Sequence, residues 1–176
     1  MQAVAFLESN QAKALVLDLR NNGGGLVDDA SRIADVLLPQ GNIFTLVDKN
    51  GNVTYSGDSD MKCLGLPLAV LVNEYSASAS EILAGAIQDH EVGVLVGTQT
   101  FGKGIVQTPL TFADSSVLML TTEYYLTPDG RKIHGEGLTP DIESVLSEDA
   151  HIYLMTDEED NQLQDALHYL KGQIAD

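Results

Sequence analysis

Residues 66–88 read LPLAVLVNEYSASASEILAGAIQ, an apolar run that leads through three spaced serines into a helical pattern. The run at 66–72 is short, uncharged and contains β-branched valines, which is typical of a buried β-strand. Ser76, Ser78 and Ser80 stand where the following helix begins, and a hydroxyl there can bond N–H groups that lack partners inside the helix. The stretch therefore predicts a buried strand leading directly into a helix.

The same pattern recurs upstream of this stretch. The apolar run ALVLDL at 14–19 precedes NNGGG at 21–25, and helical spacing follows over 28–38. Further strands are expected at 42–48, 53–56, 92–96, 104–111, 116–120 and 121–126, the first two joined as a hairpin. Repeated strand–helix alternation predicts an α/β fold of layered β-sheets with flanking helices, in a single domain over 1–176.

The C-terminal part of the chain is acidic. Of a formal net charge of −17, much arises from residues 141–176, which hold ten acidic residues against Lys171 alone. Residues 156–171 predict a terminal helix, with Thr156 and Glu159 as a capping box. An acidic surface repels phosphate backbones, so we expect no nucleic-acid partner.

Composition excludes several other classes of protein. No apolar run approaches the ~18 residues of a membrane-spanning helix, and Met1–Asn10 lacks the pattern of a secretory signal. Cys63 is the only cysteine, so neither an intrachain disulfide nor a thiolate zinc site can form. We expect Cys63 to pack as a small side chain, and we expect no metal or organic cofactor.

Ser78 is open to two interpretations. With Glu81 three residues later it fits a capping box, which is a purely structural role. Free N–H groups at a helix start also stabilise developing negative charge, as a catalytic serine requires. The local sequence leaves both interpretations open.

A catalytic serine needs a base. The four histidines are His90, His134, His151 and His168. None has an obvious orienting carboxylate, so a Ser-His-Asp triad is not supported, and only His134, in a glycine-rich loop, is retained as a candidate.

Lys103 is the stronger candidate for a base, because it lies between two glycines and before an apolar strand in TFGKGIVQ. An ordinary lysine has a pKa of about 10.4 and is a poor base at neutral pH, but burial favours the neutral amine. Gln107 faces the same side of an extended strand as Lys103, so its amide could orient the amine. A surface loop lysine and an exposed strand glutamine are equally compatible with the pattern.

The glycines of NNGGG, after a strand and before a helix, let the backbone approach a ligand closely. The spacing matches neither GxxxxGK[ST] nor GxGxxG, so a phosphate-binding loop is poorly supported. The segment is equally compatible with half of an oxyanion hole and with a simple tight turn.

These elements, in this order, resemble the C-terminal processing (tail-specific) serine proteases. The resemblance rests on LVLDLRNNGGGL at 15–26, VLVNEYSASASEILAGAIQD at 70–89, VGTQTFGKGIVQ at 96–107 and GEGLTPDI at 135–142. It covers roughly residues 10–145, and it implies a crotonase-like α/β fold and a serine–lysine dyad.

The resemblance also implies roles for individual residues. Ser78 would be the nucleophile, Lys103 the general base and Gln107 the residue that positions the lysine. The backbone N–H groups of Gly24 and Ala79 would form the oxyanion hole.

This chain has three glycines where the family usually has proline and two glycines. Glycine in place of the proline leaves the backbone N–H of Gly24 available but loosens the loop that presents it. Gly25 is therefore the alternative donor.

The family further implies protein or peptide substrates cleaved near their C-termini, and an extracytoplasmic location in the periplasm or cell envelope. Its members usually carry a PDZ domain, which we expect in the full-length protein, with this chain as an N-terminally truncated core. A missing strand would leave an unpaired sheet edge, which favours a homo-oligomer or a domain-swapped dimer. The alternatives are a non-catalytic peptide or small-molecule binding module on the same fold, and acyl-thioester chemistry, which gives Lys103 no role.

Overall fold

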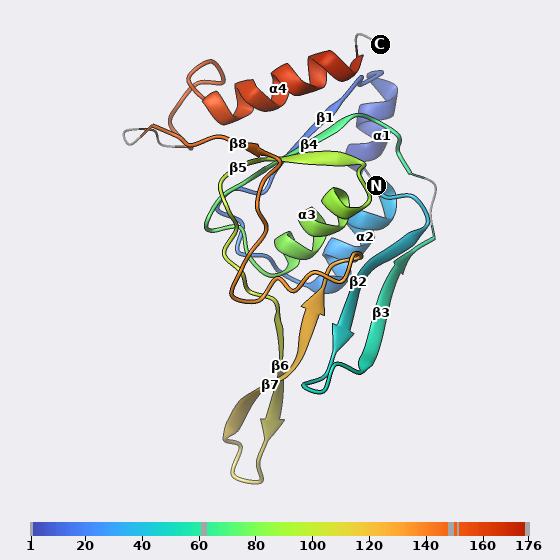
Figure 1. Cartoon of the computed structure of the whole chain (residues 1–176), viewed down its shortest axis with the longest axis vertical. Coiled ribbons are helices and arrows are strands. Elements are labelled where there is room, and N and C mark those ends of the chain that lie inside the picture. The colour runs from blue at the N-terminus through green and yellow to red at the C-terminus, as the bar shows by residue number, and fades with distance from the viewer. Residues whose placement is uncertain (1, 61–62, 148–149, 151, 175–176) are drawn as a thin grey trace.

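The computed structural model describes residues 2–60, 63–147, 150 and 152–174, which form two four-stranded sheets and four helices (Figure 1). The parallel sheet has the order β1 (Leu15–Asp18), β4 (Leu68–Val72), β5 (Gly93–Gly97), β8 (Ile142–Glu143). The antiparallel sheet has the order β3 (Val53–Ser59), β2 (Gly41–Val47), β7 (Val117–Leu126), β6 (Ile105–Thr111). The helices are α1 (Gln2–Ser9), α2 (Val27–Leu37), α3 (Ala79–Asp89) and α4 (Asn161–Ile174).

The layers follow from the alternation of side chains along β4, which is buried on both faces. Leu68, Val70 and Val72 pack with α2 and α3 in one core cluster, which also includes side chains of β2. Ala69 and Leu71 point to the opposite face and pack with α4 in a second cluster, because successive residues of a strand face opposite sides. Helices α2 and α3 therefore lie between the two sheets, with α4 outside the parallel sheet (Figure 1), which confirms the layered α/β expectation.

Several boundaries differ from the expected ones; β3, for example, extends to Ser59 instead of ending at residue 56. Residues 117–126 form one continuous strand, β7, where the sequence predicts two strands that meet at residues 120 and 121. A β-bulge in the pairing with β6 lies near this expected break. Helix α4 begins at Asn161 instead of Thr156, because Asp160 accepts the backbone N–H of Leu163 at 3.0 Å and caps the helix. The expected pair of Thr156 and Glu159 forms a separate turn ahead of it, with Thr156 N 2.9 Å from Glu159 Oε2.

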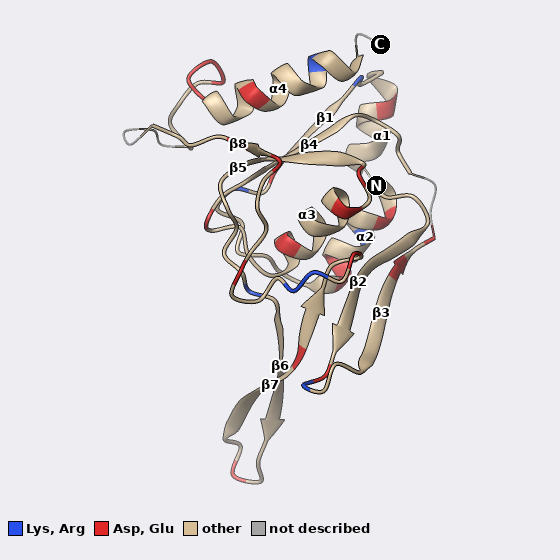
Figure 2. Cartoon of the chain, viewed as in Figure 1, with Lys and Arg blue, Asp and Glu red and all other residues tan. Residues whose placement is uncertain are grey.

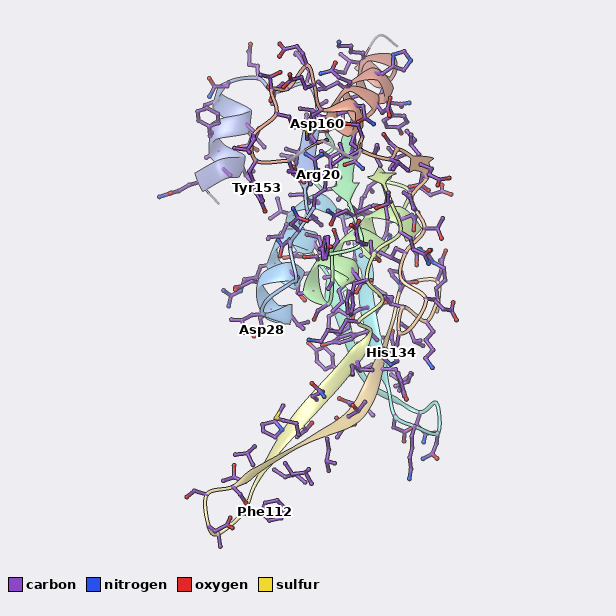
Figure 3. The ribbon with its side chains drawn as sticks, turned by 90° about the vertical axis from the view of Figure 1, so that its left-hand side faces the viewer. Arg20, Asp28, Phe112, His134, Tyr153 and Asp160 are labelled. Atoms are coloured by element: carbon purple, nitrogen blue, oxygen red, sulfur yellow. The ribbon has the colours of Figure 1, made fainter. Side chains whose placement is uncertain are left out.

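A buried arginine links the end of β1 to α4. Arg20 donates two hydrogen bonds to Asp160, at 3.0 and 2.8 Å, and one to Gln162 at 3.1 Å. It also pairs with Asp18 at 2.7 Å, and Figure 3 shows Arg20 and Asp160 together beneath α4. The link fixes the start of the NNGGG segment against the C-terminal helix.

The β6–β7 hairpin projects from the body of the molecule, with Phe112 near its tip (Figures 1 and 3). Its apolar side chains are largely exposed: Leu110, Phe112, Val117, Leu118, Met119 and Leu120. Acidic residues predominate elsewhere, including the segment that leads into α4 (Figure 2). Among the described residues, no helix is long and apolar enough to cross a membrane.

Candidate active site

Ser78 occupies the sharp turn between β4 and α3. Its backbone has φ 58° and ψ −118°, a combination that residues with a side chain rarely adopt and that costs free energy unless the surroundings impose it. Ser78 is the N-cap residue of α3 and is half-buried. A strained turn from strand to helix presents a hydroxyl in front of the free N–H groups of the helix.

Glu81 holds this turn in place. Its side chain is fully buried, and Oε2 accepts the Ser78 N–H at 2.9 Å. The Ser78 hydroxyl lies near the Glu81 N–H in the arrangement of a capping box, without a regular cap hydrogen bond of its own. The expected capping box of Ser78 and Glu81 is thus confirmed, with the 2.9 Å bond to the carboxylate as its regular hydrogen bond.

The same carboxylate also binds the loop that carries Lys103. Oε2 accepts the Lys103 N–H at 2.8 Å, while Oε1 accepts the Gly102 N–H at 2.8 Å and the Thr100 hydroxyl at 2.5 Å. One buried side chain therefore joins the start of α3 to residues 100–103.

The side chain of Lys103 is exposed, although the glycines on both sides of it are buried. Of the two settings that the sequence leaves open for this lysine, the structure has the surface loop and not the apolar, closely packed one. The glycines are buried because other backbone segments pass close to them: a Cβ at Gly104 would lie 2.6 Å from His134 N, and one at Gly102 would lie 2.9 Å from Gly137 N. These contacts fix the backbone of the loop and leave the lysine side chain free to move.

Gln107 is the third residue of β6, and its side chain is exposed. Lys103 precedes the strand, so the two do not share its regular alternation. No hydrogen bond joins their side chains in the part of the chain that the structure describes. That Gln107 positions Lys103 stays a prediction.

Gly24 lies directly against the serine turn. Its φ is +91°, and a Cβ there would lie 2.6 Å from Ala77 O and 2.8 Å from Ala79 N. Only glycine fits this position without a shift. The Gly24 N–H donates to Asn22 Oδ1 at 3.0 Å, whereas no acceptor among the described residues takes the N–H of Ala79.

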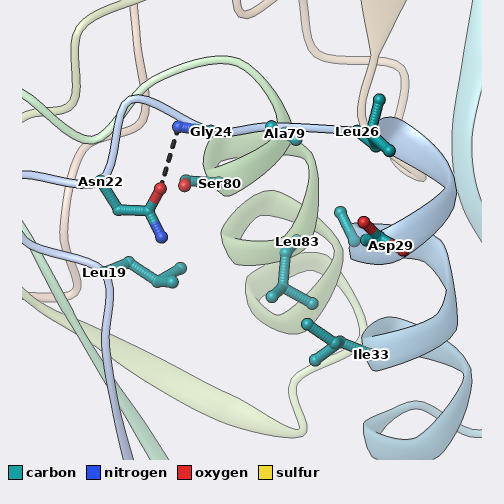
Figure 4. A pocket seen from close by; sticks show the side chains of 11 residues that line it. Leu19, Asn22, Gly24, Leu26, Asp29, Ile33, Ala79, Ser80 and Leu83 are labelled. Carbon is teal, nitrogen blue, oxygen red and sulfur yellow. Dashed lines mark hydrogen bonds between the residues drawn. The ribbon is translucent and has the colours of Figure 1, made fainter.

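A cavity of about 180 Å³ opens beside these two residues (Figure 4). Its lining is mostly apolar and comes from the NNGGG segment, α2 and α3: Leu19, Asn22, Gly24, Gly25, Leu26, Asp29, Ala30, Ile33, Ala79, Ser80 and Leu83. A small apolar side chain of a ligand would fit this space. Gly25 is exposed at its edge.

The neighbouring serines have different environments. Ser76 is buried, donates to Leu19 O at 2.7 Å and accepts the Asn73 N–H at 3.0 Å, so its hydroxyl links β1 to the serine turn. Ser80 lines the cavity from the first turn of α3. Ser76 therefore has a structural role.

The three histidines that the structure describes do not assemble a triad. His90 ends α3 and its Nε2 lies 2.7 Å from Asn42 O, and His168 is exposed on α4. His134 packs against the ring of Tyr124, and its buried Nδ1 has no partner among the described residues. His151 lies outside the described residues, and within them no group of three or more potential metal ligands occurs.

Two residues at the site escaped the sequence prediction. Asn22 could have been found, because an asparagine side chain commonly bonds the N–H two residues on in a turn. Thr100 could not, since its hydroxyl meets Glu81 through a contact between segments 19 residues apart in the chain.

A model of peptidase family S41 matches residues 1–144. The chain belongs to peptidase family S41. Two curated S41-like relatives carry the name "Probable CtpA-like serine protease". The one from Staphylococcus haemolyticus is 36% identical over 173 residues, 97% of this chain and 35% of its own length. The one from Staphylococcus aureus is 41% identical over 143 residues, 80% of this chain and 29% of its own.

The solved structure of the photosystem II D1 C-terminal processing protease agrees with this S41 assignment. It superposes with a TM-score of 0.78 at 38% identity, over 82% of this chain and 38% of the other. The expected resemblance to C-terminal processing serine proteases and the α/β fold class are confirmed. The chain spans about a third of the length of the curated S41 relatives it matches.

Proposed function

We propose that this chain is the catalytic core of a serine endopeptidase in which Ser78 is the nucleophile and Lys103 the general base. One observation carries the proposal: Ser78 and Lys103 donate their backbone N–H groups to the same oxygen of Glu81, at 2.9 and 2.8 Å. The backbone nitrogens of Ser78 and Lys103, which are 25 positions apart in the sequence, are therefore separated by at most two hydrogen-bond lengths. The strained backbone of Ser78 supports the same assignment, because strain concentrates at functional residues.

The proposed reaction is acyl transfer. Neutral Lys103 removes the proton of the Ser78 hydroxyl as Oγ attacks the carbonyl carbon of a peptide bond. The resulting oxyanion is stabilised by the N–H groups of Ala79 and Gly24. The protonated lysine then donates its proton to the leaving amine, and water hydrolyses the acyl-enzyme with the lysine again acting as base.

The exposure of Lys103 gives the substrate a part in this chemistry. A lysine in water is protonated at neutral pH, so the amine must lose its hydration before it can act as a base. A peptide bound across Ser78 would cover Lys103 and exclude water from it. Gln107, whose amide carries no charge, would then orient the amine without favouring its protonated form.

For the whole protein we propose cleavage of protein substrates near their C-termini, in an extracytoplasmic compartment and without a metal or organic cofactor. The substrate's C-terminus would be captured by a PDZ domain elsewhere in the full-length protein, and residues 1–176 would act as one catalytic domain in a homo-oligomer. These proposals draw on the S41 family and the relatives named above.

The decisive experiment is labelling by a serine-directed fluorophosphonate, followed by identification of the modified peptide. We expect labelling at Ser78 that is lost in Ser78→Ala and strongly reduced in Lys103→Met, which keeps the apolar stem without the amine. Ser80→Ala, at the adjacent cavity, and Lys13→Met, outside the site, are matched controls that should label normally. Equal labelling of Lys103→Met would exclude the dyad, and bound peptide without any labelling would favour the non-catalytic binding module.

A further inference from the structure

The two proposed oxyanion donors are not equally available. The Gly24 N–H is already bonded to Asn22 Oδ1 at 3.0 Å (Figure 4), whereas the Ala79 N–H beside it has no acceptor in the described part of the chain. The two residues lie close together, since a Cβ on Gly24 would approach Ala79 N to 2.8 Å. In this conformation, a reacting carbonyl oxygen would find one free donor instead of two.

We propose that Asn22 is a positioning residue whose side-chain oxygen competes with the reacting carbonyl oxygen for the Gly24 N–H. The inference rests on the proposed function, since it requires acyl transfer at Ser78. It adds a residue to the site and assigns it an effect on the rate of the chemical step.

The effect follows from the charge on the competing acceptors. Asn22 Oδ1 and the carbonyl oxygen of a bound peptide are both neutral, so exchanging one for the other gains little. Attack by Ser78 converts that carbonyl into an oxyanion, and hydrogen bonds to charged acceptors are about twice as strong as neutral ones. The Gly24 N–H therefore moves to the substrate only as charge develops, and an interaction made only in the transition state raises kcat without tightening substrate binding.

The surroundings allow this exchange. The backbone of Asn22 is fixed on both sides, because its N–H bonds Leu19 O at 3.2 Å and its carbonyl accepts the Ala77 N–H at 3.1 Å. Its side chain, in contrast, lines the cavity of about 180 Å³ and can turn into that space. A Cβ added at Gly23 or Gly25 would have nothing within 4 Å of it, so open space adjoins the segment on both sides of Gly24.

A different role for Asn22 would be only to hold the turn of the NNGGG segment. Aspartate serves that role as well as asparagine does, because both side chains bond the N–H two residues on. A structural role thus predicts that Asn22→Asp behaves like the wild type and that Asn22→Ala is impaired. Competition for the Gly24 N–H predicts the reverse: Asn22→Asp is impaired and Asn22→Ala is not. A carboxylate holds the Gly24 N–H more tightly than an amide does, and it also repels the oxyanion.

The test is to measure kcat and KM of both variants with a fluorogenic peptide. We expect Asn22→Asp to lower kcat by at least about 10-fold, towards the ~10²-fold loss of an oxyanion donor. Asn22→Ala should lower KM by about 2- to 10-fold, because the Gly24 N–H can then form one net hydrogen bond with the neutral carbonyl of the substrate. The control Asn10→Asp adds the same charge on an exposed residue away from the site and should keep wild-type kinetics. Any other order of the two Asn22 variants would overturn the inference.

A second measurement needs no turnover. In the adduct of a peptide boronic acid with Ser78, the Gly24 N–H should have left Asn22 Oδ1 for the boronate oxygen, as seen in a crystal structure or in the amide proton shift of Gly24. Persistence of the bond to Asn22 in the adduct would overturn the inference. Failure of the proposed function is distinguishable, because Ser78→Ala would then react with fluorophosphonate as fast as the wild type.

Discussion

Ser78 and Lys103 are joined through a single atom, because the backbone N–H groups of both donate to Oε2 of Glu81, at 2.9 and 2.8 Å. The relationship fixes the backbone at both positions, while the side chain of Lys103 is exposed. The proposed transfer of a proton between the two side chains requires such a frame, because catalytic groups act only when they are held close to the productive geometry.

Replacing Glu81 by Gln should therefore dismantle the site with almost no change of shape. The amide keeps one acceptor oxygen but puts an NH₂ group opposite either the N–H groups of Ser78 and Lys103 or the Gly102 N–H and the Thr100 hydroxyl. We expect a loss of about 1–3 kcal/mol in the free energy of unfolding, as for other buried donors left unpaired, together with a large loss of fluorophosphonate labelling. Urea unfolding and labelling rates would measure the two effects.

Glu91→Gln removes the same charge from an exposed position beyond α3 and serves as the control. If Glu81→Gln unfolds like the wild type and labels at the same rate, the carboxylate does not organise the site.

Ser76 and Ser78 should respond to substitution in opposite directions. Ser76→Ala removes a buried hydroxyl that bonds Leu19 O and Asn73 N–H, so we expect it to lower stability by about 1–3 kcal/mol. Ser78→Gly places glycine at a φ of 58°, which glycine adopts without strain, so it should raise stability by about 1 kcal/mol while abolishing activity.

Thermal unfolding of the two variants beside the wild type would measure this contrast. A Ser78→Gly variant less stable than the wild type would mean that the hydroxyl supports the fold, and the strain argument for a catalytic serine would fail.

The sequence was sufficient to predict local structure but not the contacts that assemble the site. Strands, helices and the pairing of Ser78 with Glu81 are encoded in periodicity and in spacings of three or four residues. The contacts of Glu81 with Lys103 and of Arg20 with Asp160 join segments 22 and 140 residues apart. No local pattern specifies them, because they exist only once the sheets have packed.

The same distinction explains why the sequence leaves the environment of Lys103 open and predicts the wrong start for α4. The neighbours of Lys103 in sequence are compatible with a packed lysine and with a surface loop lysine; in the structure other segments bury the flanking glycines while Lys103 is exposed. The start of α4 was placed at Thr156 because the motif there is a good cap, but Asp160, held by Arg20, caps the helix instead.

Gly24 should tolerate no side chain, in contrast to its neighbours. A Cβ at Gly24 would lie 2.6 Å from Ala77 O, a backbone atom that cannot give way cheaply, and its φ of +91° adds strain. We expect Gly24→Ala to cost about 1–2 kcal/mol or more in the free energy of unfolding and to abolish labelling of Ser78.

Gly25→Ala is the matched control, because nothing lies within 4 Å of its Cβ position and its φ carries no restriction. It should unfold and label nearly as the wild type does. Equal loss in both variants would mean that the segment needs flexibility along its length and not a close approach at Gly24.

The link between Arg20 and Asp160 predicts how the docking of α4 depends on pH. Burial by itself raises the pKa of Asp160, but the hydrogen bonds from Arg20 and from the Leu163 N–H outweigh it and hold that pKa below its ordinary value of 3.8. A carboxyl group whose pKa is lower in the folded state contributes stability above the unfolded value, and this contribution is lost as pH falls through the folded value.

Asp160→Asn isolates this effect, because asparagine caps a helix as well as aspartate does and Arg20 keeps its pair with Asp18. At neutral pH we expect the variant to be less stable than the wild type by about 1–3 kcal/mol, the range for hydrogen bonds to charged groups. The difference should stay constant down to about pH 4 and shrink below it, as Asp160 is protonated in the wild type. Urea unfolding across this range would measure it, and a difference that grows on acidification would show that Arg20 does not stabilise the charged form of Asp160.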